Sequence, residues 1–354
     1  MKLSYIKGIF LSAVLVLLNF LYINIACADK AVNTPAAKAF IQKTAKEYKI
    51  DPSYIRYLLR RAKYLPQVIP SMEAPPEKTL TWYQYRNELI TPEKIADGIK
   101  FWDKSNKLLD WAKREYGVPQ EIILAIIGIE SNYGKNMGRL RVLDVLTTLA
   151  FYYPPREKFY RSELAAFIAL AKTLDRSPFS FYGSYGGAMG MPQFMPSNYL
   201  YYGVDFHGSK YPNIFKDKAD AIFSVANFLR QKGWEPNEPI ILPAKISGND
   251  YRALLRKEGK HLSKPKFNLR TIAKYGVVPE GFVDDRLRAN LIVFTEANDT
   301  KSYWLALNNF YTLKRYNNSN LYAMAVYSLG QQLRLKWDQL QNQRRTKKAA
   351  TKKN

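Results

Sequence analysis

Cysteine and histidine are nearly absent from this sequence of 354 residues, which holds one cysteine and two histidines. The cysteine, Cys27, lies in a segment that we expect to be removed, so the mature chain has no thiol for a disulfide, a cysteine nucleophile or a zinc–thiolate site. His207 and His261 stand near no plausible nucleophile or second ligand, which argues against a Ser/His triad and a histidine-rich metal site. No G-x-x-x-x-G-K-S/T phosphate loop is present.

Acidic residues are also few, since 30 Asp and Glu stand against 54 Lys and Arg and leave a formal net charge of +24. Such a charge favours a polyanionic partner or polyanionic surroundings. The start of the chain indicates which. Lys2 and Lys7, an apolar run over 9–22 and then Ala26-Cys27-Ala28 have the order of a secretory signal that is cleaved after Ala28. We therefore predict export to the periplasm or cell envelope, where anionic wall polymers rather than nucleic acid are the usual partners.

Two alternatives for this N-terminal segment stay open. The apolar run is slightly long for a signal, so it could be an uncleaved anchor helix. Cys27 could instead be lipidated after a different cleavage. Asn24 stands where a lipoprotein signal usually carries Leu, which argues against lipoprotein anchoring.

Hydrophobic periodicity and turn residues divide the rest of the chain into segments with helical or strand-like sequence patterns. Helical repeats and long helical patterns precede a stretch of short, β-branched segments bounded by turn residues, and helical patterning then returns. The predicted divisions are a signal peptide (1–28), a helical domain (29–119), a core with a Gly-rich loop (120–234), a small β-rich insert (235–299), a return to the core (300–340) and a basic, disordered tail (341–354).

One carboxylate stands out in the stretch "AIIGIESNYGKNMG", where Glu130 ends an apolar run that indicates a buried helix with a stop near Gly134. Burial disfavours the charged form of a carboxyl group and raises its pKa. The group therefore either pairs with a cation, for which Arg139, Arg141 and Arg156 are candidates, or holds a proton near neutral pH. In a cleft lined by aromatic and amide side chains, a protonated carboxyl suits the cleavage of a sugar polymer.

Five segments that cover nearly the whole mature chain carry a resemblance to a known family. They are "YGVPQEIILAIIGIESNYGKNMG", "RVLDVLTTLAFYYPPREKFYRSEL", "GSYGGAMGMPQFMPSNYLYYGVDF", "ADAIFSVANFLRQKGW" and "NFYTLKRYNNSNLYAMAVYSLG". In order and spacing they resemble the lytic murein transglycosylase B family, glycoside hydrolase family 103. The resemblance implies an α+β, mainly α, fold class: a lysozyme-like core domain with a helical N-terminal domain and a small β-rich insert.

The resemblance also implies a reaction. Members of this family cleave the β-1,4 bond between N-acetylmuramic acid and N-acetylglucosamine in peptidoglycan and leave 1,6-anhydromuramoyl ends. Their single catalytic Glu falls on Glu130, which would act first as general acid and then as general base. A hydrolytic muramidase on the same core and a non-catalytic peptidoglycan-binding scaffold remain the alternatives. The implied partners are peptidoglycan glycan strands and cell-wall synthesis or remodelling proteins, with no nucleic acid, and the implied state is a monomer.

Further residues fall on positions that line the sugar-binding cleft of the family. These substrate-binding candidates are Tyr85, Ser184, Gln193, Tyr316, Asn317 and Tyr322, with Arg156 where the family has a basic residue for a substrate carboxylate. Two departures accompany them. Pro155 stands where a second Arg is usual, and Phe228 where Tyr is common.

Calcium is the last expectation that the resemblance raises. Some family members bind it in an EF-hand-like loop, and the equivalent stretch here runs through Asp205, His207, Ser209, Tyr211 and Asp220, with Lys210 at the bend. Calcium needs several oxygen ligands, and Lys210 adds a positive charge. We therefore predict that the calcium site is lost, and we predict no cofactor and no metal.

Overall fold

The structure is a computed structural model that describes residues 32–258 and 263–351. The predicted signal peptide, Cys27 and His261 lie outside the described residues. The described chain forms two compact units. The first contains the described residues up to Glu73 together with Met137–Met189 and Gln193–Tyr201, and the second contains Ala74–Asn136, Gly190–Pro192 and the chain from Tyr202 onward.

The first unit is helical and is built around a buried helix pair. Its elements are α2 (Pro35–Tyr48), α3 (Pro52–Arg61), α4 (Val68–Glu73), α9 (Val142–Tyr152), α10 (Glu157–Thr173), α11 (Pro196–Tyr202) and the short antiparallel strands β1 (Leu140–Arg141) and β2 (Tyr182–Gly183). Thr34 and Asp51 cap α2 and α3 by accepting backbone N–H groups. α9 is buried on every side from Val142 to Ala150, and it packs against α10. It is therefore the centre of this unit.

The helices of the second unit surround α8. They are α5 (Pro76–Thr79), α6 (Trp82–Leu89), α7 (Pro92–Tyr116), α8 (Gln120–Ser131), α12 (Lys218–Gln231), α15 (Asn308–Lys314) and α16 (Asn320–Thr351). α8 is apolar on all faces from Ile122 to Ile127, and it packs against α7, α12 and α16. A helix that is hydrophobic all round belongs in a core. The predicted buried helix before Glu130 is therefore confirmed.

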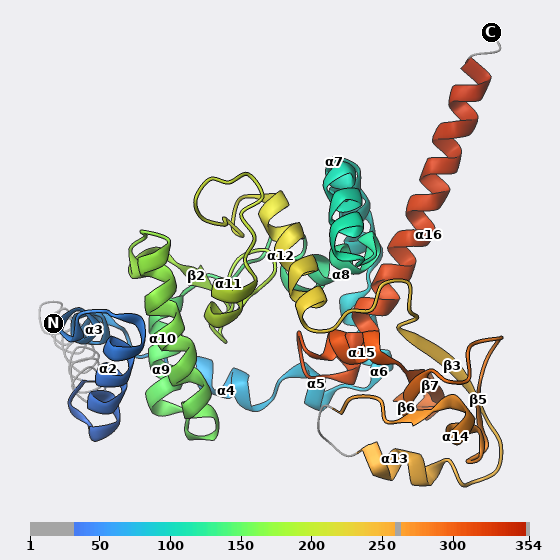
Figure 1. Cartoon of the computed structure of the whole chain (residues 1–354), viewed down its shortest axis with the longest axis horizontal. Helices are drawn as coiled ribbons and strands as arrows, with labels where there is room; N and C mark the ends of the chain where they lie inside the picture. Colours follow the sequence, from blue (N-terminus) through green and yellow to red (C-terminus); the bar gives the residue numbers. More distant parts are fainter. Residues whose placement is uncertain (1–31, 259–262, 352–354) are drawn as a thin grey trace, which may run out of the picture. The chain divides into compact units, whose positions relative to one another are not determined.

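A five-stranded antiparallel sheet completes the second unit, in the order β4-β6-β7-β3-β5. Figure 1 labels β3, β5, β6 and β7 of this sheet. The strands are β3 (Ile241–Ile246), β4 (Phe267–Asn268), β5 (Val277–Pro279), β6 (Arg288–Thr295) and β7 (Lys301–Ala306), with the helices α13 (Arg252–Glu258) and α14 (Leu269–Ala273). Leu291 pairs with Leu305 across β6 and β7, and both side chains are buried in the apolar core of the sheet. The predicted β-rich insert ends at Asp299, but the sheet continues to Ala306. Asp299 lies in the turn of the β6–β7 hairpin, so the predicted end falls halfway through a paired element.

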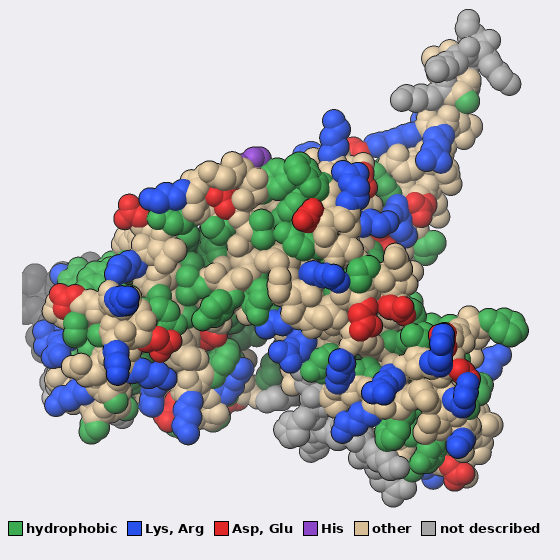
Figure 2. Space-filling model, viewed as in Figure 1, with side chains coloured by type: hydrophobic (Ala, Val, Ile, Leu, Met, Phe, Trp, Pro, Cys, Tyr) green, Lys and Arg blue, Asp and Glu red, His purple; other side chains and the backbone are tan. Residues whose placement is uncertain are grey.

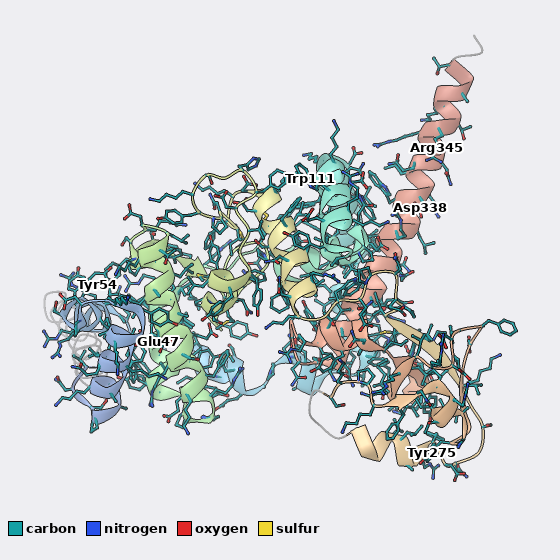
Figure 3. The ribbon with its side chains drawn as sticks, viewed as in Figure 1. Glu47, Tyr54, Trp111, Tyr275, Asp338 and Arg345 are labelled. Carbon is teal, nitrogen blue, oxygen red and sulfur yellow. The ribbon has the colours of Figure 1, made fainter. Side chains whose placement is uncertain are left out.

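The predicted disorder of the tail is wrong for residues 341–351, which continue α16. Leu333 and Trp337 anchor the helix in the core, and Arg344 binds Asp103 of α7 with 2.6 Å between nitrogen and oxygen. The segment contains no Gly or Pro and consists largely of good helix formers, so the helix propagates from its anchored part. Figure 3 labels Arg345 in this segment and Asp338 just before it on α16.

The predicted helical domain (29–119) does not form one unit. α2, α3 and α4 belong to the first unit, whereas α5, α6 and α7 belong to the second. The reason is packing, because α7 contacts α8, α12 and α16, while α2 contacts α3 and α10. The α+β, mainly α, fold class is confirmed. Lys and Arg side chains are spread over the visible face of both units rather than gathered in one patch (Figure 2).

Candidate active site

Glu130 lies in the last turn of α8, at the edge of the second unit's core. The helix ends at Ser131, three residues before the predicted stop at Gly134. Asn132 and Tyr133 adopt left-handed backbone angles, with φ of 48° and 59°, and Gly134 continues the reversal with a φ of 86°. Non-glycine residues rarely adopt this conformation. Ser131 holds the turn in place because its hydroxyl donates to the Met191 carbonyl at 2.7 Å and accepts the Gly134 N–H at 3.0 Å.

The reversal buries the Tyr133 ring against two glycines. A Cβ atom added at Gly98 of α7 would lie 2.4 Å from the Tyr133 hydroxyl oxygen, and one added at Gly128 of α8 would lie 2.6 Å from it. Both helices therefore approach the ring at positions where only glycine fits. The end of α8, which carries Glu130, is fixed by this contact.

The Glu130 carboxylate accepts a hydrogen bond from the Tyr322 hydroxyl at 2.6 Å. The pKa of Glu130 is raised from 4.5 to about 7, and burial is the largest cause. The hydrogen bond from Tyr322 lowers this pKa, the negative charge of Glu77 raises it, and the positive charge of Lys94 lowers it. Within the described residues no ion pair reaches Glu130. The arginine-paired alternative is therefore not borne out.

Two tyrosines from the start of α16 and the segment before it stand beside this carboxylate. The rings of Tyr316 and Tyr322 are stacked, with centroids 6.3 Å apart. Burial first, and then the negative charge of Glu130, raise the pKa of both hydroxyls well above the usual value. The Tyr316 hydroxyl donates to the Pro192 carbonyl, and its ring meets Phe228 edge-on at 4.8 Å. Phe228, a departure from the family pattern, is therefore a packing residue here.

A second carboxylate, Glu77, joins two other predicted cleft residues. Its Oε1 atom accepts hydrogen bonds from the Tyr85 hydroxyl and from the Asn317 side-chain amide, each at 3.2 Å. Glu77 comes from the short helix α5, Tyr85 from α6 and Asn317 from the loop before α16. The second unit thus brings together Glu130, Tyr85, Tyr316, Asn317 and Tyr322.

The remaining predicted residues, Arg156, Ser184 and Gln193, belong to the first unit. The Arg156 side chain is exposed and lies over the Phe159 ring, 4.2 Å from its centroid. The Ser184 hydroxyl accepts the N–H groups of Gly186 and Ala188, which is the turn role that a serine beside glycines performs. Gln193 has a left-handed backbone, and its amide donates to the Met137 carbonyl at 3.1 Å. Their roles toward substrate stay predictions.

Glu77 and Lys94 are site residues that sequence patterns did not indicate. Lys94 is partly buried and donates to the Gly128 carbonyl at 3.3 Å. Glu77 lies in a Pro-rich stretch that reads as an extended connection but forms α4 and α5. No local pattern distinguishes either residue, because their partners lie far away in sequence.

The loop that corresponds to the calcium site of some relatives satisfies its carboxylates internally. The two oxygens of Asp220 accept the backbone N–H groups of Phe206 and Asn213, at 2.9 and 2.6 Å. Asp205 accepts a hydrogen bond from the Ser209 hydroxyl at 3.0 Å. In the described part of the chain no cluster of three or more His, Cys, Asp or Glu side chains is placed to hold a metal ion. A calcium ion needs six to eight oxygen ligands, and the loss of the calcium site stays a prediction.

Comparison with known proteins identifies the family of this chain. The family described as transglycosylase SLT domain matches residues 33–331. The chain is also 35% identical over 315 residues to membrane-bound lytic murein transglycosylase B of Escherichia coli (strain K12), and the match covers 86% of this chain and 84% of that protein. The chain belongs to the transglycosylase SLT domain family. The resemblance to the lytic murein transglycosylase B family is thereby confirmed.

Solved structures resemble this SLT-domain chain over most of its length. Catenated lytic transglycosylase SltB1 from Pseudomonas aeruginosa is 36% identical, with a TM-score of 0.80 over 86% of this chain and 99% of that one. SltB3 from Pseudomonas aeruginosa, solved in complex with NAG-anhNAM-pentapeptide, is 28% identical, with a TM-score of 0.70 over 84% of this chain and 78% of that one. Among the described helices of the SLT-domain chain, none is both long enough and apolar enough to cross a membrane.

Proposed function

We propose that this chain is a lytic transglycosylase that cleaves the MurNAc–GlcNAc β-1,4 bond of peptidoglycan and forms 1,6-anhydromuramoyl ends. The observation that carries the proposal is the partly buried carboxyl of Glu130, whose pKa of about 7 lets it hold a proton near neutral pH, in a chain of the SLT family. The relatives named as lytic transglycosylases support the same activity.

The reaction needs one group that gives a proton and takes one back. Protonated Glu130 donates its proton to the glycosidic oxygen, and the bond from that oxygen to C1 of the muramoyl residue breaks. The C6 hydroxyl of the same residue then attacks C1 and loses its proton to the Glu130 carboxylate. The carboxyl returns to its starting state without consuming water, and the substrate's own acetamido group can stabilise the positive charge at C1.

Tyr322 suits both halves of this cycle. Its hydroxyl donates to Glu130, which stabilises the carboxylate form that exists between the two proton transfers. Burial raises the pKa of Glu130, and the hydrogen bond from Tyr322 lowers it. The hydrogen bond therefore sets the balance between a carboxyl that keeps its proton and one that gives it up.

The proposed surroundings follow from the charge and the N-terminal segment. The enzyme works as a monomer on glycan strands in the periplasm or cell envelope, delivered by a cleaved signal peptide, and meets wall synthesis or remodelling proteins there. Its excess of 54 basic over 30 acidic residues suits an envelope of anionic polymers.

Mass spectrometry of digested peptidoglycan tests the reaction. Each cut by a transglycosylase leaves an anhydromuramoyl end whose mass is lower by one water than the reducing end that a muramidase leaves. We expect anhydro ends from purified protein incubated with isolated sacculi. Reducing ends would instead identify a hydrolytic muramidase, and intact sacculi with bound protein would identify a scaffold.

Calcium is expected to have no effect on stability, because the loop carboxylates are already bonded to backbone N–H groups. Thermal unfolding followed in calcium and in EDTA should give the same midpoint, with magnesium as the control for ionic strength. A midpoint that rises with calcium concentration, and not with magnesium, would contradict this prediction, since a ligand that binds only the folded state stabilises it increasingly as the ligand concentration exceeds the dissociation constant.

A further inference from the structure

We propose that Glu77 is a positioning residue of the active site, which holds Tyr85 and Asn317 in place and sets a second negative charge near Glu130. The inference rests on the proposed function, because it takes the site of Glu130 to be catalytic. It assigns a role to a carboxylate that is separate from the proton-transferring one. Glu77 is not itself a proton donor in this scheme.

The first ground is geometry. One oxygen of Glu77 accepts two hydrogen bonds, from the Tyr85 hydroxyl and from the Asn317 amide, both at 3.2 Å. Tyr85 is buried, and Glu77 and Asn317 are partly buried. An ionised carboxylate is acceptor-only, so it orients both donors, and hydrogen bonds to a charged acceptor are stronger than neutral ones. With its amide nitrogen directed at Glu77, the Asn317 side chain keeps its oxygen as the acceptor for a substrate N–H group.

The second ground is the set of charges around Glu130. Tyr322 and Tyr316 face it from the C-terminal side, Lys94 acts on it from α7, and Glu77 acts from α5. After burial itself, Glu77 is the group that raises the pKa of Glu130, whereas Tyr322 and Lys94 lower it. Lys94 also donates to the Gly128 carbonyl, which holds its ammonium group against the backbone of α8. The charge of Glu77 thus opposes the effect of Tyr322 and Lys94, which favour the deprotonated form of Glu130.

The charge of Glu77 and its role as a hydrogen-bond acceptor affect activity in different ways. A general acid works only in its protonated form, so activity falls as pH rises through a pKa of about 7. Removal of the Glu77 charge lowers the pKa of Glu130, and the alkaline fall in activity then begins at a lower pH. Removal of the hydrogen-bond acceptor has a different effect, because it frees Tyr85 and Asn317 at every pH.

Two substitutions separate these effects. Glu77→Gln keeps an oxygen that can accept from Tyr85 and Asn317 but removes the charge, whereas Glu77→Ala removes both. Glu88→Gln on α6 removes an exposed charge and is the matched control. The first readout is the titration of the Glu130 carboxyl carbon by NMR in protein with labelled glutamate, assigned with Glu130→Gln. The second is kcat/KM against pH on peptidoglycan.

We expect Glu77→Gln to shift the Glu130 titration and the alkaline limb to lower pH together, with kcat/KM in acid close to wild type. Glu77→Ala should in addition lower kcat/KM by about tenfold or more across the pH range, because misplaced groups lose orientation. Glu88→Gln should change neither. An unmoved Glu130 titration in folded Glu77→Gln protein would overturn the proposal. The titration needs no turnover, so its outcome stands whether or not the anhydro product is found.

Discussion

Glu130→Gln is expected to lower turnover of peptidoglycan by about 10³-fold or more while binding of glycan strands is retained. Glutamine has nearly the same shape as glutamic acid, but it has no proton to donate and cannot accept one as a carboxylate does. A positioned acid or base contributes about 10²–10⁴-fold to a rate, and Glu130 is asked to serve in both roles. Release of soluble muropeptides measures turnover, and sedimentation with sacculi measures binding.

A control for this substitution lies on the same helix. Glu121 is in the first turn of α8 and lies 3.9 Å from Arg334 across to α16, far along the helix from Glu130. Glu121→Gln should keep turnover near the wild-type rate. If Glu130→Gln retained normal turnover, Glu130 would have no part in the mechanism. If it lost binding together with turnover, the substitution would have disturbed the fold of the site.

Gly128→Ala is expected to reduce both stability and activity. Its Cβ would lie 2.6 Å from the hydroxyl oxygen and 2.7 Å from the Cζ atom of Tyr133, a rigid ring packed also against Gly98. Overpacking of this kind lowers stability by about 1–3 kcal/mol. Because Glu130 is two residues further along α8, a shift of the helix end moves the carboxyl, and a misplacement of about 1 Å can lower a rate by about 10²-fold.

Gly330→Ala is the matched control for Gly128→Ala. Gly330 lies on α16, which packs against α8, and an added Cβ would lie 3.2 Å from the Cδ1 atom of Ile122 and 3.3 Å from the Glu121 carbonyl oxygen, both longer than the contacts of a Cβ at Gly128. The gain in helix propensity, about 1 kcal/mol for Gly to Ala, offsets this tight contact. Denaturant unfolding and muropeptide release compare the two variants. Equal stability of Gly128→Ala and wild type would show that the Tyr133 ring can move aside.

Much of the fold could be predicted because the patterns are local. The apolar run of α8 and the short, β-branched, turn-bounded segment of β6 identify a buried helix and a strand from neighbouring residues alone. The errors arise where distant contacts decide the outcome. The end of α8 at Ser131 depends on the Met191 carbonyl, and the continuation of α16 to Thr351 depends on its anchor in the core.

The site shows the same division. Glu130 is visible in the sequence as a carboxylate in an apolar run, and Tyr85, Asn317 and Tyr322 are visible through the family resemblance. Glu77 could not be recognised as a site residue from the sequence, because its hydrogen-bond partner Asn317 lies 240 positions away. A carboxylate in a Pro-rich stretch has no feature that would reveal such a partner.

The hydrogen bond from Tyr322 to Glu130 spans 192 positions of the chain, and its donor lies on the last helix. A growing polypeptide therefore has no assembled catalytic centre until α16 has been made and has docked against α8. Partial chains, whether unfinished on the ribosome or cut by a protease before Tyr322, would contain Glu130 without the Tyr322 hydroxyl that lowers its pKa. A wall-degrading enzyme built in this way becomes competent only after α16 has been made and has docked against α8.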